Sequence, residues 1–170
     1  MTASTDRTPQ VVCTDVRSRA EAAALGVDVD RWRRLALDCL GSEGVGGELT
    51  VTFVDRDEIA ELNLEHMGID GPTDVLSFPL DDESPAGVPT LLGDVVISPA
   101  IAAGQAVDHA GSVDDELALL VVHGILHVLG HDHAVAAEAE RMRARELELL
   151  RAHHWHGPPP DGFRHEHPPS

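Results

Sequence analysis

Two residue types are missing from this sequence, which contains no lysine and no tyrosine. The 12 basic residues are therefore all arginines, and 30 acidic residues bring the formal net charge to −18 at pH 7. A surface of this sign repels nucleic acid and anionic membranes at long range. Any binding of phosphate groups must therefore be a local property of the surface.

Cysteines and long apolar runs are also scarce. Cys13 and Cys39 show no C-x-x-C spacing, which argues against both a disulfide framework and a cysteine zinc site. The residues after Met1 lack the apolar core of a signal peptide, and no apolar run approaches the roughly 18 residues of a membrane span. We therefore expect a cytoplasmic protein without a membrane partner.

Short β-branched stretches and amphipathic stretches alternate along a chain whose 170 residues suit one domain. The patterns predict strands at 11–16, 48–54, 74–79 and 92–98, and helices at 31–40, 58–67, 114–129 and 135–153. The predicted fold is a single α+β domain at residues 9–153, with a small mixed four-stranded sheet packed by about five helices. Residues 1–8 and the Pro- and His-rich tail 154–170 are expected to be disordered, so deleting the tail should not change the melting temperature.

The stretch H-G-I-L-H-V-L-G-H-D-H, which starts at His123, carries the clearest chemistry. His123 and His127 are one helical turn apart, so their imidazoles leave the same face of the predicted buried helix. Gly130 permits a left-handed turn that brings the chain back, so that His133 completes the site, with His131 as the rival third ligand. Packing alone explains such a set poorly, because buried imidazoles need polar partners. We predict one divalent transition-metal ion, with zinc as the first choice, and an open fourth position typical of catalysis.

The same spacing is similar to the H-E-x-x-H-x-x-G-x-x-H pattern of metzincin proteases, except that Gly124 replaces their glutamate. That glutamate is the general base of the proteases, so peptide hydrolysis is only the second choice, and no general base is identifiable here. A glycine inside a helix costs about 1 kcal/mol relative to alanine. We hypothesise that Gly124 leaves room over the metal for a substrate or a neighbouring backbone.

Several other polar residues are candidates for supporting roles. Ser77 and Thr73, beside the strand expected to face the metal helix, could bind a substrate phosphate, and Asp74 could orient a ligand histidine through its Nδ1–H. The alternative for Thr73 and Asp74 is turn chemistry, in which side chains bond to the backbone at the entrance of a strand. Asp132 is expected to fix the turn between the ligands or to support one of them. We interpret Glu116 as a structural anchor.

With these residues in view, the chain resembles the YbeY family of rRNA-maturation endoribonucleases. The histidine stretch matches that family's H-G-x-L-H-L-x-G-x-D-H signature apart from Val128, and the blocks G-P-T-D-V-L-S-F-P (71–79) and L-G-D-V-V-I-S (92–98) agree in order and spacing. The resemblance covers roughly residues 9–152. It departs at Met67, where the family often has an arginine, and at His131, where it commonly has tyrosine.

The resemblance implies a small mixed sheet packed by helices and a metal held by His123, His127 and His133. It also implies metal-dependent cleavage of single-stranded RNA, with roles in 16S rRNA 3′ processing and ribosome quality control. The implied partners are single-stranded rRNA and the small ribosomal subunit or one of its proteins, and DNA is not expected. Besides a metallopeptidase, the alternative is a non-catalytic ribosome-assembly factor whose metal is structural.

Basic residues concentrate in two places that could serve such a substrate. They are Arg31, Arg33 and Arg34 in the first long helix, and Arg141, Arg143, Arg145 and Arg151 in the last. Glutamates at 138, 140, 146 and 148 accompany the second series, which we therefore interpret as a solvated face. The first cluster is the better candidate for contact with RNA or the ribosome.

Overall fold

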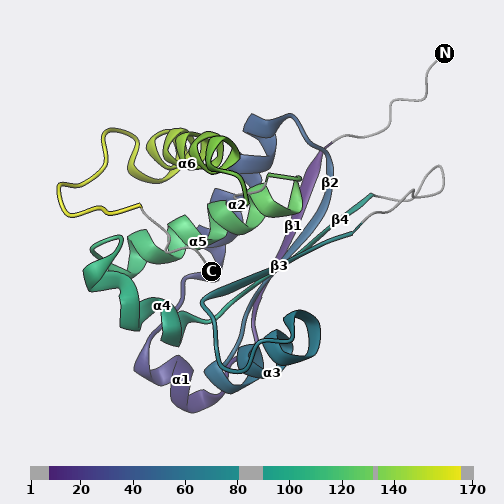
Figure 1. Ribbon diagram of the computed structural model, residues 1–170, viewed down its shortest axis with the longest axis vertical. Coiled ribbons are helices and arrows are strands. Elements are labelled where there is room, and N and C mark those ends of the chain that lie inside the picture. The colour runs from purple at the N-terminus through teal and green to yellow at the C-terminus, as the bar shows by residue number, and fades with distance from the viewer. Residues whose placement is uncertain (1–7, 81–89, 132–133, 166–170) are drawn as a thin grey trace.

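One mixed sheet of four strands forms the frame of the protein, in the order β1-β2-β4-β3 (Figure 1). The computed structural model describes residues 8–80, 90–131 and 134–165. The strands are β1 (Pro9–Asp15), β2 (Gly47–Phe53), β3 (Val75–Pro79) and β4 (Leu91–Ile97). β1, β2 and β4 are parallel, and β3 pairs antiparallel with β4 at one edge. The predicted α+β class and mixed four-stranded sheet are confirmed.

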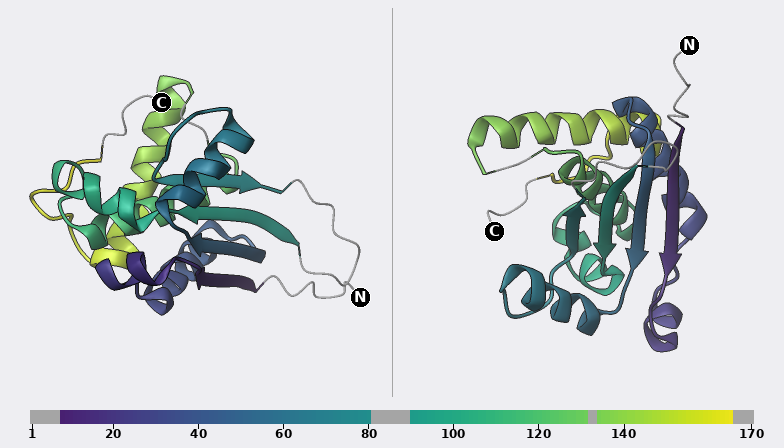
Figure 2. Two further views of the ribbon diagram at one scale, coloured as in Figure 1. Left: turned by 90° about the horizontal axis from the view of Figure 1, so that it is seen from below. Right: turned by 90° about the vertical axis from the view of Figure 1, so that its right-hand side faces the viewer.

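Six α-helices and two short helical turns accompany the sheet in the described part of the chain. They are α1 (Arg19–Ala24), α2 (Val29–Glu43), α3 (Arg56–Met67), α4 (Pro99–Gln105), the 3-10 turn η1 (Ala106–Asp108), α5 (Val113–Val128), α6 (Ala136–Leu150) and the π-helical turn η2 (Arg151–Trp155). Helix α5 crosses the middle of the molecule with α6 alongside it, and α3 lies at the opposite end (Figures 1 and 2). Among the described residues, no helix combines the length and apolar character that a membrane crossing requires.

Each face of the sheet packs against its own cluster of apolar side chains. Leu49 and Val51 of β2 are completely buried in the main core, which also contains most of α5 and the apolar side of α2. A smaller cluster gathers Ile59 of α3 with Leu76 and Val96 on the other face. This division follows from the alternation of side chains along a strand, which the sequence shows for 48–54.

The start of α2 agrees with the sequence pattern, whereas its end does not. The sequence offers Asp28 or Asp30 as the cap, and the structure uses Asp28, whose side chain accepts a hydrogen bond from the Arg31 backbone N–H at 3.2 Å. The sequence pattern also predicts that the helix ends at Gly41, and this prediction is wrong. The helix continues to Glu43 and ends at Gly44, which adopts the left-handed conformation with φ of 69°. Gly41 stays helical, so a glycine alone was not a sufficient stop signal.

Helix α5 is apolar on nearly every side and is almost entirely buried, as expected. Ser112 caps its start by accepting from the Asp115 N–H at 3.1 Å. The predicted turn at Gly130 is present, with φ of 101°. There the His131 N–H donates to the Leu126 carbonyl at 2.9 Å, which closes the end of the helix and redirects the chain.

The C-terminal segment differs from the disordered tail expected from residue 154. Helix α6 changes into η2 at Arg151, and there the indole N–H of Trp155 donates to Asp115 Oδ1 at 2.8 Å. Phe163 then packs edge-on against Trp155, with ring centroids 4.7 Å apart. The Arg164 N–H donates to the His109 carbonyl at 2.8 Å. The segment 156–165 is therefore attached to the domain, whereas 1–7 and 166–170, also expected to be disordered, lie outside the described residues.

Removing this segment should weaken the domain. Truncation after His156 removes the half-buried Phe163 and its contact with Trp155, and we expect a loss of about 1–2 kcal/mol, or roughly 3–8 °C in Tm. Truncation after His165 keeps every described contact and is the matched control. Calorimetry of the two truncated proteins checks the prediction, and equal melting temperatures would contradict it.

Candidate functional site

His123 and His127 form a pair on α5. Their ring centroids are 4.6 Å apart and the ring planes meet at 82°. His123 is buried and His127 is half-buried. The predicted alignment of the two imidazoles on one helical face is therefore present in the structure.

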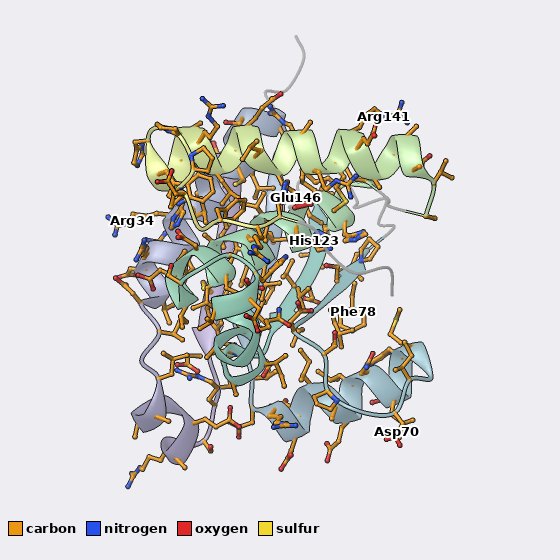
Figure 3. All side chains as sticks on the ribbon, turned by 60° about the vertical axis from the view of Figure 1, so that its left-hand side comes forward. Arg34, Asp70, Phe78, His123, Arg141 and Glu146 are labelled. Atoms are coloured by element: carbon orange, nitrogen blue, oxygen red, sulfur yellow. The ribbon has the colours of Figure 1, made fainter. Side chains whose placement is uncertain are left out.

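Glu146 of α6 is a buried carboxylate that contacts His123 of this pair. Its Oε1 lies 3.1 Å from Nδ1 of His123, and its Oε2 lies 3.1 Å from Nε2 of His165 in the C-terminal segment. Figure 3 shows Glu146 on α6 directed toward His123 on α5. Glu146 is only 1% exposed, so its assignment to a solvated face of the last helix is wrong. The role of Glu146 is not visible in the sequence, because it stands among other glutamates of α6 and resembles an ordinary surface residue.

The protonation state of Glu146 determines which nitrogen of His123 carries hydrogen. Burial alone raises the pKa of the carboxyl, but the hydrogen bonds with His123 and His165 outweigh burial and bring the pKa from 4.5 to about 2. Glu146 is therefore ionised near neutral pH and can only accept hydrogen bonds. Nδ1 of His123 must then carry the hydrogen and act as the donor in this contact.

Gly124 faces the sheet and not the space over the histidines. A Cβ atom at this position would lie 2.5 Å from Cγ1 of Val95 and 3.3 Å from Oγ of Ser77. The Ser77 hydroxyl donates to the Gly124 carbonyl at 3.2 Å. Gly124 therefore lets α5 approach β3 and β4 closely, and the room that we hypothesised over a metal is instead filled by Val95.

Thr73 and Asp74 take part in the entrance to β3. Asp74 Oδ1 accepts from the Val75 N–H at 2.8 Å and from the Thr73 hydroxyl at 3.4 Å, while Oδ2 accepts from the Gln105 amide at 2.7 Å. These are the turn contacts that we weighed as the alternative. A contact between Asp74 and a ligand histidine, our other hypothesis for this residue, stays a prediction.

Glu116 anchors the start of α5, as interpreted from the sequence. It is completely buried and accepts from the Gln105 amide at 2.8 Å, the Ala110 N–H at 3.2 Å and His109 Nδ1 at 2.8 Å. Through Gln105 this network continues to Asp74. It therefore joins the entrance of β3, the end of α4 and the segment after η1 to the first turn of α5.

The third predicted ligand, His133, and the predicted turn residue Asp132 lie outside the described residues. His131, the rival ligand, is half-buried after the Gly130 turn. Within the described ranges, no group of three or more histidine, cysteine, aspartate or glutamate side chains could hold a metal ion. The described site thus consists of two aligned imidazoles and the carboxylate behind one of them.

Two of the three arginines in the first cluster have acidic partners. Arg31 pairs with Asp114 at 2.9 Å, and Arg33 lies 3.8 Å from Asp30. On α6, Arg145 pairs with Glu43 and Glu148. The expectation that the first cluster is the better contact for RNA remains a prediction, but two of its charges are partly neutralised.

The fold and the described geometry define a small α+β protein with a histidine pair on a buried central helix. Residues 17–154 match the family model described as Endoribonuclease YbeY. A relative of that name from Salinispora tropica is 46% identical over 77% of this chain and 91% of its own length, and one from Thermobifida fusca is 43% identical over 77% and 89%. The chain therefore belongs to the YbeY family, and the resemblance drawn from its motifs is confirmed.

A solved structure supports the fold independently of the family match. The solution structure of TM1509 from Thermotoga maritima aligns with a TM-score of 0.53 at 24% sequence identity. The alignment covers 86% of this chain and 92% of that one. The likeness extends over most of both chains and concerns the fold.

Substitution of Gly124 tests the close approach of α5 to the sheet. Gly124→Ala should destabilise the protein by about 1–3 kcal/mol, because the added methyl overlaps the side chain of Val95. The matched control is Gly41→Ala in α2, where a Cβ meets nothing within 4 Å and alanine should stabilise by up to about 1 kcal/mol. Placing Gly124→Ala in a Val95→Ala background should reduce its effect, and urea unfolding of the parent and the four variants measures it. An equal gain in stability at both glycines would contradict the packing argument.

Proposed function

We propose that this chain is a metal-dependent endoribonuclease that cleaves single-stranded RNA. The observation that carries the proposal is the buried contact between Glu146 and His123 beside His127, in a chain of the YbeY family. A carboxylate behind an imidazole is the arrangement that orients a metal-binding histidine and raises its basicity. The relatives named Endoribonuclease YbeY supply the class of reaction.

The donor set fits a divalent transition metal. His123 would bind through Nε2, because Nδ1 is engaged by Glu146. His127 lies beside it, and His133 is the third ligand proposed from the sequence motif. Neutral imidazoles favour zinc among the common ions. A bound ion supplies Lewis-acid stabilisation of the charge that develops on a phosphodiester during hydrolysis.

The residues around the pair have positioning roles in this proposal. Glu146 holds the His123 ring and its tautomer, and Ser77 ties the strand β3 to the backbone of α5 at Gly124. Ser77 and Thr73 remain our candidates for contact with a substrate phosphate. We assign no general base, since the carboxylate nearest the pair already accepts from His123 and His165.

The packing of Gly124 argues against the metallopeptidase alternative. A general-base glutamate at that position would have to share its space with Val95, whose Cγ1 would lie 2.5 Å from the new Cβ. The carboxylate chemistry of the metzincin proteases is therefore absent, and no room exists to restore it at that position. Phosphodiester hydrolysis has no such requirement.

We further propose a cytoplasmic role in 16S rRNA 3′ processing and ribosome quality control, with the small ribosomal subunit or one of its proteins as partner. The charge of −18 supports the need for such a partner, because the chain offers few cations to hold free RNA. Met67, where relatives often carry an arginine, is 57% exposed at the end of α3 and contributes no charge.

The metal proposal predicts graded losses of bound ion. The parent should hold close to one zinc or similar ion, and His127→Ala should lose most of it, whereas His131→Ala should retain it. Glu146→Gln keeps the shape but removes the charge behind His123, so the affinity should fall about 10- to 100-fold. Glu148→Gln, on the exposed side of the same helix, is the matched control. Elemental analysis and competition with a chelating dye measure the series, and equal affinity of the two glutamine variants would exclude a positioning role for Glu146.

The catalytic proposal predicts turnover of a defined single-stranded RNA and none of the fully paired duplex. His127→Ala should abolish cleavage while the far-UV circular dichroism spectrum stays that of the parent. Gel analysis of the products against time provides the measurement. A folded parent that carries its metal and leaves the single strand intact would support the non-catalytic assembly factor instead.

A further inference from the structure

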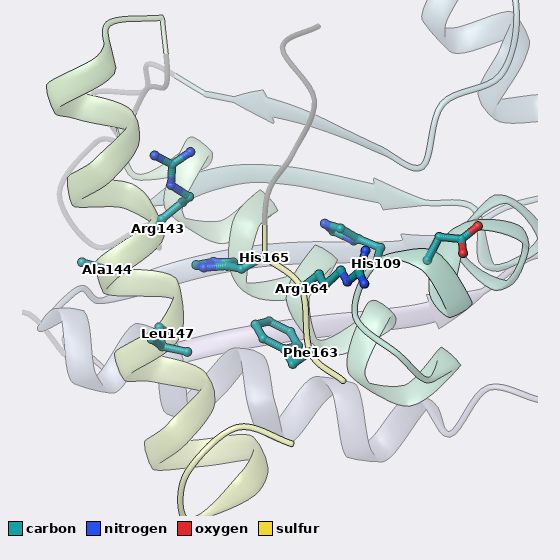
Figure 4. Close-up of a pocket in the computed structure, with 8 residues that line it drawn as sticks. His109, Arg143, Ala144, Leu147, Phe163, Arg164 and His165 are labelled. Atoms are coloured by element: carbon teal, nitrogen blue, oxygen red, sulfur yellow. The ribbon is translucent and has the colours of Figure 1, made fainter. Parts of the chain in front are cut away.

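An open hollow of about 800 Å³ lies between α6, η1 and the C-terminal segment (Figure 4). Arg143 and Leu147 line it from α6, His109 follows η1, and the segment contributes Phe163, Arg164 and His165. The volume is within the range of pockets that hold small molecules or single nucleotides. Phe163, Arg164 and His165 lie beyond the residues 17–154 that match the family model.

The charge of the hollow differs from that of the molecule. Of the described side chains that line it, two are guanidinium groups, Arg143 and Arg164, and one is a carboxylate, Asp108. Neither guanidinium forms an ion pair within the described residues, in contrast to Arg145, which pairs with Glu43 and Glu148. In a chain of net charge −18, two such arginines at one hollow, Arg143 on α6 and Arg164 on the C-terminal segment, give it a local attraction for anions.

The carboxylate of Glu146 lies between the hollow and the histidine pair. His165, in its wall, contacts Glu146 at 3.1 Å, and Glu146 contacts His123 at 3.1 Å. Arg143 precedes Glu146 on α6 by one helical turn and therefore leaves the helix on the same side. The hollow is therefore connected to the Nδ1 side of His123 through the buried Glu146.

The wall also presents aromatic rings. Phe163 and His165 stand beside each other with centroids 5.6 Å apart and planes tilted by 35°, and Figure 4 shows both directed toward α6. Rings of this kind stack on nucleic acid bases without sequence preference. Guanidinium groups next to such rings are the usual combination in sites for single strands, where phosphate and base are bound together.

We propose that this hollow binds a nucleotide of single-stranded RNA, with Arg143 and Arg164 on the phosphate groups at its two ends and Phe163 and His165 against the base. The assignment of RNA rests on the proposed function, whereas the capacity to bind a nucleotide rests on the hollow itself. The C-terminal segment is thus part of the substrate site, and His165 connects that site to Glu146.

Binding of a fluorescein-labelled, 2′-O-methylated oligouridine, which resists cleavage, tests the proposal on the full-length, metal-loaded protein. Arg143→Ala and Arg164→Ala should each weaken the affinity by about three- to tenfold, and the double variant should lower the slope of log K against log salt by about 1.4. Arg143→Lys keeps the charge and should keep the slope. Arg151→Ala, an exposed arginine just after α6, is the matched control and should change the affinity less than about twofold.

The variant Phe163→Leu distinguishes the stacking of Phe163 on a base from its packing in the fold. The leucine keeps an apolar side chain in the wall, so binding of the oligouridine should fall by about fivefold or more while binding of an abasic oligonucleotide stays the same. Equal losses for both ligands would show that Phe163 acts only through the fold.

The outcomes distinguish this proposal from the proposed function. A parent that binds the oligouridine and is unaffected by the arginine substitutions overturns the nucleotide site and leaves the endoribonuclease proposal standing. A parent whose binding depends on both arginines but which cleaves no RNA supports the nucleotide site and overturns the endoribonuclease. A parent that does not bind the oligouridine overturns the nucleotide site, and the cleavage assay then decides the function by itself.

Discussion

The contact between Glu146 and His123 connects the parts of the molecule on which the candidate site depends. An ionised carboxylate that is only 1% exposed requires polar partners, because an uncompensated buried charge is strongly destabilising. Its partners come from α5 and from the C-terminal segment, so one side chain of α6 holds three elements together. The same bond sets the tautomer of His123. Glu146 therefore both stabilises the packing of these elements and orients the His123 ring.

The close approach of α5 to the sheet is the second constraint. Gly124 leaves space for Val95 and lends its carbonyl to Ser77, so the helix that carries the histidines is held against β3 and β4 between the two imidazole positions. At the start of the helix, Glu116 ties it to Gln105 and Ala110. Held at several points along its length, α5 is a rigid support, which is what a site built from two imidazoles requires.

Charge is distributed unevenly over this acidic protein. The overall field disfavours the approach of RNA, yet the hollow beside the site has two guanidinium groups against one carboxylate. The hollow is therefore a local exception to the sign of the overall charge.

The sequence by itself determined those features that follow from short-range geometry. Short β-branched stretches identified the four strands, apolar composition identified the buried helix, and one-turn spacing placed His123 beside His127. The left-handed turn at Gly130 is equally local. Glu146 and Phe163 were beyond such reasoning, because their patterns, a glutamate among charged neighbours and a lone aromatic in a Pro-rich tail, are those of solvated residues. Only the tertiary structure buries them, since their partners His123 and Trp155 become neighbours through the packing of α5, α6 and the returning chain.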